Sequence, residues 1–80
     1  MVYFVYMIIT KIKCKRISYV GYTNNLEKRI KLHNLSKGAK FTKGKKWKLV
    51  YYKKFNTKSL AMKYEYLLKN DKKNQARYLD

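Results

Sequence analysis

Residues 18–34, which read SYVGYTNNLEKRIKLHN, decide the fold of this chain. Ile17 to Val20 are mostly β-branched or aromatic, a composition typical of a strand. Gly21 follows at once and is expected to end the strand in a tight turn, where its lack of a side chain is an advantage. The stretch therefore predicts a strand, a glycine turn and then a helix.

The helix is expected to begin at Asn24 or Asn25. Asn24 with Glu27 three residues later resembles a capping box, with asparagine in place of serine or threonine. Apolar or ring side chains then recur at helical spacing, at Leu26, Ile30 and His33, and Arg29 shares their face. The pattern predicts a helix that packs one face on a sheet and carries an arginine and a histidine there.

A second strand is expected before this stretch. Residues 2–10 are β-branched and aromatic at both odd and even positions, which favours a strand covered on both faces. The polar segment from Lys11 to Arg16 has the length of a hairpin loop. Residues 2–10 and 17–20 are therefore predicted to form an antiparallel hairpin.

The rest of the chain predicts a basic loop, a strand and a long helix. Residues 34–46 are polar and rich in lysine, and residues 47–52 predict a third strand. A final helix is capped by Asn56 or Thr57, and its apolar stripe is Leu60, Ala61, Tyr64, Leu67 and Leu68. Residues 71–80 are charged and either add a short helix or fray.

These elements come in the order β-β-α-β-α, which predicts an α+β domain. We expect a three-stranded antiparallel sheet flanked by helices. Eighty residues leave no room for a second core, so residues 1–80 are expected to form one domain with its core in about residues 3–70.

The charge of the chain points to a polyanionic partner. Lysine and arginine outnumber the acids by 21 to 4, a net charge of +17 that repels itself unless an anion neutralises it. Nucleic acid is the leading candidate, since phosphate contacts supply most of the affinity of basic proteins for it. An anionic membrane surface is a weaker candidate, because the expected helices are short and mixed in character. No stretch reaches the length of a spanning helix.

The single cysteine, Cys14, excludes an internal disulfide and a multi-cysteine zinc site. The apolar N-terminus lacks the basic leader and cleavage site of a signal peptide. The expected location is therefore the cytoplasm, and no membrane partner is expected.

The scarcity of acids limits the metal chemistry open to this chain. The acids are Glu27, Glu65, Asp71 and Asp80. Three of them are placed at a helix start, beyond the long helix or at the end of the sequence, so only Glu65 is a plausible metal ligand. A cluster of carboxylates for two metal ions is excluded, and a site with one metal and one carboxylate remains possible.

Arg29 and His33 lie one helical turn apart, so their side chains point the same way. The guanidinium group suits a phosphate, and the imidazole titrates near neutral pH. A tyrosine beside such cations is expected to have a lowered pKa and could then act as a base. Each of these residues alone has a more ordinary structural explanation, and only their joint pattern points to a site.

The ordered set resembles the GIY-YIG nuclease domain over roughly residues 3–70. Phe4-Val5-Tyr6 stands where that family has its first triplet, and Tyr19-Val20-Gly21 where it has its second. Arg29 follows the glycine by eight residues, as the helix arginine of the family does. Further similar segments are His33-Asn34, residues 38–42, residues 47–52, and residues 61–65 with the glutamate.

The resemblance implies a role for each matching residue. Tyr6 would be the general base or would position the attacking water, and Tyr19 would hydrogen-bond near the scissile phosphate. Arg29 would bind that phosphate, and Glu65 would hold one Mg²⁺ or Mn²⁺. His33 would assist proton transfer or orient Tyr6, and Gly21 would let the backbone pass close to the site.

Two positions depart from the family pattern. Phe4 replaces the first glycine of the first triplet, which many small members tolerate, and Tyr22 stands where several members have lysine. A lysine at that position therefore cannot activate Tyr6. This gives more weight to His33, or to hydroxide on the metal, as the source of the base.

The expected function is a metal-dependent DNA endonuclease. Branched, flapped or single-stranded DNA is the favoured substrate, cut by this chain alone or with a protein partner. Non-specific phosphate contacts are expected from Lys28, Lys37, Lys40, Lys43, Lys45 and Lys46. The alternative is a noncatalytic basic module that binds DNA or RNA on the same fold.

Overall fold

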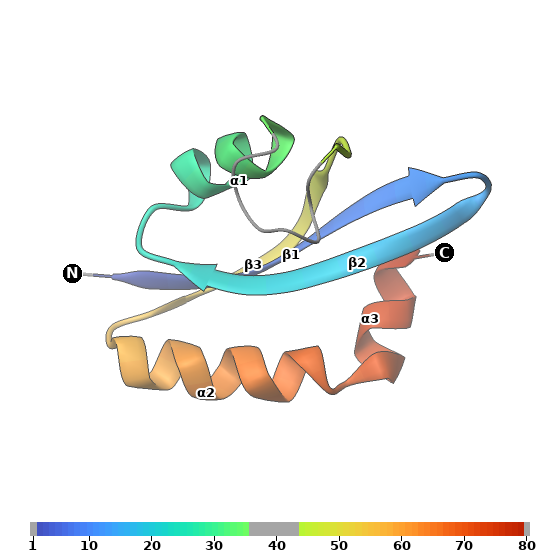
Figure 1. Ribbon diagram of the computed structural model, residues 1–80. Coiled ribbons are helices and arrows are strands. Elements are labelled where there is room, and N and C mark those ends of the chain that lie inside the picture. Colours follow the sequence, from blue (N-terminus) through green and yellow to red (C-terminus); the bar gives the residue numbers. More distant parts are fainter. Residues whose placement is uncertain (1, 36–43, 80) are drawn as a thin grey trace.

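The computed structural model describes residues 2–35 and 44–79. Three antiparallel strands form one sheet in the order β2-β1-β3, with β1 at Tyr3–Ile12, β2 at Lys15–Thr23 and β3 at Lys48–Phe55. Helix α1, Leu26–Asn34, lies over one face (Figure 1). Helices α2, Lys58–Lys69, and α3, Lys72–Leu79, lie over the other. The predicted α+β class is confirmed.

The central strand β1 divides the apolar core into two parts. Val5 and Met7 point to the α2 side, where they pack with Val20, Ala61 and Leu68. Tyr6 and Ile8 point to the α1 side, where they pack with Trp47, Leu26 and Ile30. All four of these β1 side chains are completely buried. The apolar character at both odd and even positions of residues 2–10 follows from this two-sided burial.

The hairpin between β1 and β2 is longer than the sequence pattern predicted. The strands continue to Ile12 and from Lys15, so the expected loop of residues 11–16 shrinks to two residues. Lys13 and Cys14 both have positive φ, 47° and 70°. Two positive φ angles are typical of the type I′ turn, whose twist matches that of the flanking strands. The absence of glycine at the turn hid it in the sequence.

Gly21 lies inside β2, so the prediction that it ends the strand in a turn is wrong. It pairs directly with Tyr6 of β1. A Cβ atom at position 21 would lie 2.6 Å from the Tyr6 hydroxyl oxygen and 2.9 Å from the ring carbon that carries it. Glycine is needed here because the side chain of Tyr6 lies over this position.

The helix caps are partly as predicted. Asn25, rather than Asn24, caps α1, and its side-chain oxygen accepts a hydrogen bond from the Lys28 backbone N–H at 3.1 Å. Thr57 caps α2 and accepts from the Leu60 backbone N–H at 3.2 Å. Residues 72–79 form α3, whose first turn is capped by the Asp71 carboxylate.

The apolar stripe of α2 is narrower than predicted. Ala61 and Leu68 are buried and Tyr64 is half-buried, whereas Leu60 and Leu67 are 52% and 57% exposed. The sheet has only three strands, and it covers only one arc of the helix. The prediction that Leu60 and Leu67 join the core is therefore wrong.

The side chain of Asn34 ties the end of α1 to the residue before β3. Its amide nitrogen donates to the Trp47 carbonyl at 3.2 Å, and its oxygen accepts from the Trp47 backbone N–H at 2.6 Å. Part of the segment between them, residues 36–43, lies outside the described residues, and so do the predicted phosphate contacts Lys37, Lys40 and Lys43. Within the described ranges, every helix is too short or too polar to cross a membrane.

Substitution Gly21→Ala is expected to lower the free energy of unfolding by about 1–3 kcal/mol, because the added methyl group collides with the Tyr6 ring. Urea denaturation followed by circular dichroism measures the loss. Only part of it should disappear in a Tyr6→Phe background, since this change removes the hydroxyl oxygen at 2.6 Å but keeps the ring carbon at 2.9 Å. Gly44→Ala is the control, because its φ of 76° has a cost that does not depend on Tyr6. A loss below about 0.5 kcal/mol for Gly21→Ala would contradict this account.

Candidate active site

Tyr6, His33 and Arg29 form one hydrogen-bonded group under helix α1. The Tyr6 hydroxyl lies 2.7 Å from Nε2 of His33, and both side chains are completely buried. Nε of Arg29 donates to the same hydroxyl oxygen over a longer distance, 3.4 Å. Because Arg29 donates to the oxygen, we assign the phenolic proton to the bond with His33. This makes Nε2 the unprotonated nitrogen of a neutral imidazole.

Burial sets the protonation states of this group. It raises the pKa of Tyr6 from 10.0 to about 12, and the Arg29 charge only partly opposes this effect. Burial, together with the Arg29 charge, lowers the pKa of His33 from 6.5 to about 4. The expectation that neighbouring cations lower the tyrosine pKa is therefore wrong for Tyr6, because loss of water outweighs them. Both groups are neutral at pH 7.

Tyr19 lies beside this group on the same face of the sheet. Its ring centroid is 5.2 Å from that of His33, in an edge-to-face contact, and 6.4 Å from that of Trp47. The contacts of the Arg29 guanidinium with Tyr6 and, more weakly, with Tyr19 raise the pKa of the arginine. The structure thus brings together four of the five predicted site residues, Tyr6, Tyr19, Arg29 and His33.

Glu65, the fifth, lies on α2, which packs on the other face of the sheet. Its side chain is half-buried, and its charge is among the causes that raise the pKa of Tyr6. The other described acids have different positions. Glu27 is exposed in the first turn of α1, and Asp71 caps α3. Among the acids that the structure describes, Glu65 is therefore the one whose charge contributes to the raised pKa of Tyr6.

The described residues fit a metal site with a single protein ligand. They contain no cluster of three or more histidine, cysteine, aspartate or glutamate side chains that could enclose a metal ion. Mg²⁺ does not require such a cluster, because it commonly keeps several waters and binds one or two carboxylates together with substrate phosphates. The lone carboxylate of Glu65 suits that mode of binding, and a zinc-type site is excluded for these residues.

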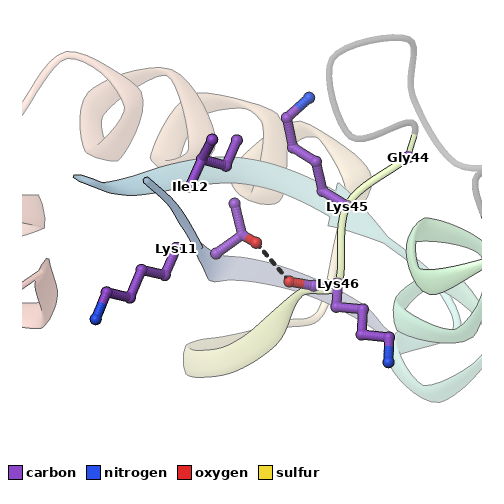
Figure 2. A pocket seen from close by; sticks show the side chains of 6 residues that line it. Lys11, Ile12, Gly44, Lys45 and Lys46 are labelled. Atoms are coloured by element: carbon purple, nitrogen blue, oxygen red, sulfur yellow. Dashed lines mark hydrogen bonds between the residues drawn. The ribbon is translucent and has the colours of Figure 1, made fainter. Parts of the chain in front are cut away.

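Lysines surround a hollow of about 450 Å³ at the far end of the hairpin. It is lined by Lys11, Ile12, Lys45 and Lys46 together with Thr10 and Gly44. Figure 2 shows the three lysine side chains pointing away from one another, so the hollow is not a closed cage for one anion. Lys28 is exposed on α1. This spread of charge suits contacts along a phosphate backbone.

Asn34 supports the site, although its sequence position marked it only as the start of a loop. Its two hydrogen bonds to Trp47 hold the end of α1 against the sheet, directly after His33. Because Trp47 packs with Tyr6 and Ile8, this contact also closes the core beneath the site. The family-like pair His33-Asn34 was the one signal in the sequence that pointed to it.

Comparison with known families gives one match that spans almost the whole chain. A family model described as the GIY-YIG catalytic domain matches residues 2–78. No solved structure matches the chain.

The similar curated proteins carry the name UPF0213. That of Clostridium perfringens is 52% identical over 66 residues, covering 80% of this chain and 71% of the relative. That of Bacillus licheniformis is 50% identical over 64 residues, covering 78% of this chain and 66% of the relative. That of Staphylococcus haemolyticus is 48% identical over 66 residues and covers 80% of both. The matched region thus spans about two thirds to four fifths of these relatives, and their names state no activity.

The low pKa of His33 predicts a stability that falls in mild acid. The residue has a pKa of about 4 when folded and about 6.5 when unfolded, so the unfolded chain takes up its proton first. The contribution of neutral His33 to the free energy of unfolding is complete above pH 6.5 and is lost as the pH falls toward 4. Over this range the free energy of unfolding falls by up to about 1.4 kcal/mol per pH unit. Urea denaturation from pH 8 to pH 4 measures this slope.

The variant His33→Gln keeps a polar group near Tyr6 but cannot titrate, so its stability should change less over the same range. A folded-state titration of His33 near pH 6.5, followed by NMR of its ring protons, would contradict the burial argument.

Proposed function

Because this chain belongs to the GIY-YIG family of nuclease-type catalytic domains, we propose that it is a metal-dependent endonuclease that hydrolyses DNA phosphodiester bonds. One observation carries the proposal. Tyr6, His33 and Arg29 share a hydrogen-bonded group beside Tyr19, and the charge of Glu65 reaches it. Two neutral proton-exchanging side chains next to a guanidinium are the groups that hydrolysis of a phosphate diester needs.

Arg29 would bind the scissile phosphate. Its contact with Tyr6 is long for an N–H···O bond, so little is lost when the guanidinium turns toward a phosphate oxygen. A guanidinium also offers two parallel donors to a phosphate, and its charge stabilises the negative charge that builds up in the transition state. The same turn would uncover the Tyr6 hydroxyl, and Tyr19 would add a further donor near the phosphate.

Tyr6 would position the attacking water as a neutral phenol. A pKa of about 12 disfavours a phenolate at pH 7, which argues against Tyr6 as a free base. Its oxygen can accept a proton from the water while its own proton passes to Nε2 of His33, so that Tyr6 stays neutral and the proton ends on His33. The low pKa of His33 makes this protonation short-lived and favours return of the proton to the leaving oxygen.

Glu65 would hold one Mg²⁺ or Mn²⁺. A bound divalent cation supplies positive charge to phosphate oxygens and lowers the pKa of a bound water. Glu65 is the ligand to propose because Glu27 and Asp71 are placed in helix starts. With one carboxylate, the other ligands would be water and substrate phosphate.

The proposed substrates are flapped, branched or single-stranded DNA. The basic charge is spread over α1, the hairpin end and the residues before β3, and this supports backbone contacts rather than base reading. The proposal includes cleavage by this chain alone or together with a second protein that brings it to such sites.

The complete burial of Tyr6 favours one alternative, a noncatalytic basic module that binds DNA or RNA on the same fold. It predicts binding that weakens steeply with salt, without strand cleavage in any divalent metal.

Substitution of the proposed site residues should remove cleavage without unfolding the chain. Arg29→Ala and Glu65→Gln should each lower the cleavage rate by about 100-fold or more, because the first removes a positive charge that stabilises the transition state and the second removes the carboxylate that would hold the metal. Tyr6→Phe should also lower it severely. The matched controls are Arg77→Ala, at an exposed position on α3, and Glu27→Gln, at an exposed position on α1, and both should cleave at nearly the wild-type rate. Normal cleavage by Glu65→Gln in Mg²⁺ would refute the metal assignment.

A panel of labelled duplex, single-stranded, flap and junction DNAs tests the activity itself. We expect strand cleavage in Mg²⁺ or Mn²⁺, none in EDTA, and a preference for substrates with unpaired segments. Binding without cleavage across the whole panel, in every metal tried, would establish the noncatalytic alternative instead.

A further inference from the structure

Helix α1 covers only part of its face of the sheet. The strand register sets two rows of side chains on this face, Gly21–Tyr6–Tyr52 and Thr23–Phe4–Lys54. The core beneath α1 contains Tyr6 but neither Phe4 nor Tyr52. The end of the face that carries Phe4, Tyr52 and Lys54 therefore lies outside this core.

Tyr52 is 56% exposed although its cross-strand neighbour Tyr6 is completely buried. The close approach of Tyr6 to Gly21 explains this contrast. The Tyr6 ring lies over β2, where glycine leaves space, and so leans away from β3. Tyr52 on β3 is therefore not covered by Tyr6 on that side.

Phe4 braces the exposed ring. The centroids of Phe4 and Tyr52 are 6.1 Å apart with an interplanar angle of 63°, an edge-to-face contact. Such a contact covers at most one face of Tyr52. An aromatic ring that is held in place with an open face is suited to stacking on another flat ring.

The charge around this ring suits a nucleic acid. Lys54 is exposed on the same face, one row from Tyr52. None of the three strands contains an acidic residue. Exposed aromatic rings among cationic side chains are the common means of binding single-stranded nucleic acid, because the ring stacks on a base while the cations hold the backbone.

We propose that Tyr52, braced by Phe4, is a stacking platform for an unpaired DNA base next to the phosphate bound by Arg29. The position of that phosphate rests on the proposed function. Tyr52 lies directly beside Tyr6 across the sheet, and neighbouring strands are about 4.8 Å apart. This spacing is comparable to one nucleotide step, about 3.4 Å along a strand. A base in a blunt duplex is already stacked, so the platform selects DNA with an unpaired base beside the cut.

The test measures binding of the full chain to single-stranded DNA that contains the fluorescent base 2-aminopurine, in EDTA so that no cleavage occurs. Wild-type protein should quench the fluorescence by stacking. Tyr52→Ala should weaken binding roughly five- to a hundredfold and remove the quenching, and Tyr52→Phe should keep both. Affinity for a blunt duplex should change less than about twofold, since its bases offer no free face.

Tyr66→Ala is the matched control, because Tyr66 is 67% exposed on α2 and belongs to the other side of the molecule. Its binding and quenching should equal those of the wild type. Circular dichroism of each variant confirms that the fold is intact. The proposal is overturned if Tyr52→Ala binds single-stranded DNA like the wild type, loses duplex affinity equally, or behaves like Tyr66→Ala.

The two proposals fail in different ways. If Tyr52→Ala loses the quenching while the wild-type protein cleaves no DNA in any metal, the stacking platform is supported and the endonuclease proposal is rejected. Cleavage with unchanged quenching in Tyr52→Ala would reject the platform alone.

Discussion

The hydrogen bond between Tyr6 and His33 is the contact on which the rest of the structure depends. It joins the central strand to helix α1 inside a region from which water is excluded, so neither polar group could be left without a partner. The glycine at position 21 exists to make room for the phenol, and Arg29 reaches the same oxygen. Stability and proposed chemistry therefore share one set of atoms, and the burial that makes the bond valuable also keeps both groups neutral.

The sequence predicted the element order and the fold class because both depend on local patterns. Strand propensity, helical spacing and caps are properties of a few neighbouring residues, and the two-sided pattern of residues 2–10 favoured a strand covered on both faces. The hairpin end was missed because Lys13 and Cys14 adopt positive φ without glycine. Leu60 and Leu67 were misplaced because a helical pattern does not say how wide the opposing sheet is.

The composition of the candidate site was also predictable, but its physical state was not. Arg29 and His33 share a helix face, and this spacing alone brings them together. Gly21 was interpreted as a turn residue. The space at position 21 is in fact taken by the side chain of Tyr6, fifteen residues away, and the pairing of these two residues shows only in the strand register. The tyrosine pKa was expected to fall because a nearby charge can be inferred from spacing. Complete burial cannot be inferred in this way, and it reverses the direction of the shift.

The two faces of the sheet are not independent of each other. Tyr6, Tyr19, Arg29 and His33 belong to the α1 face, whereas Glu65 belongs to α2 on the opposite face. Helices as short as α1 and α2 are only marginally stable by themselves. Each is therefore held in place by the apolar cluster on its side of the sheet. A loss of packing on the α2 side would displace Glu65, whose charge contributes to the raised pKa of Tyr6, although Tyr6, Arg29 and His33 had not changed. The proposed chemistry therefore requires both halves of a core that β1 divides, and the completely buried side chains of Val5, Tyr6, Met7 and Ile8 point alternately to one half and the other.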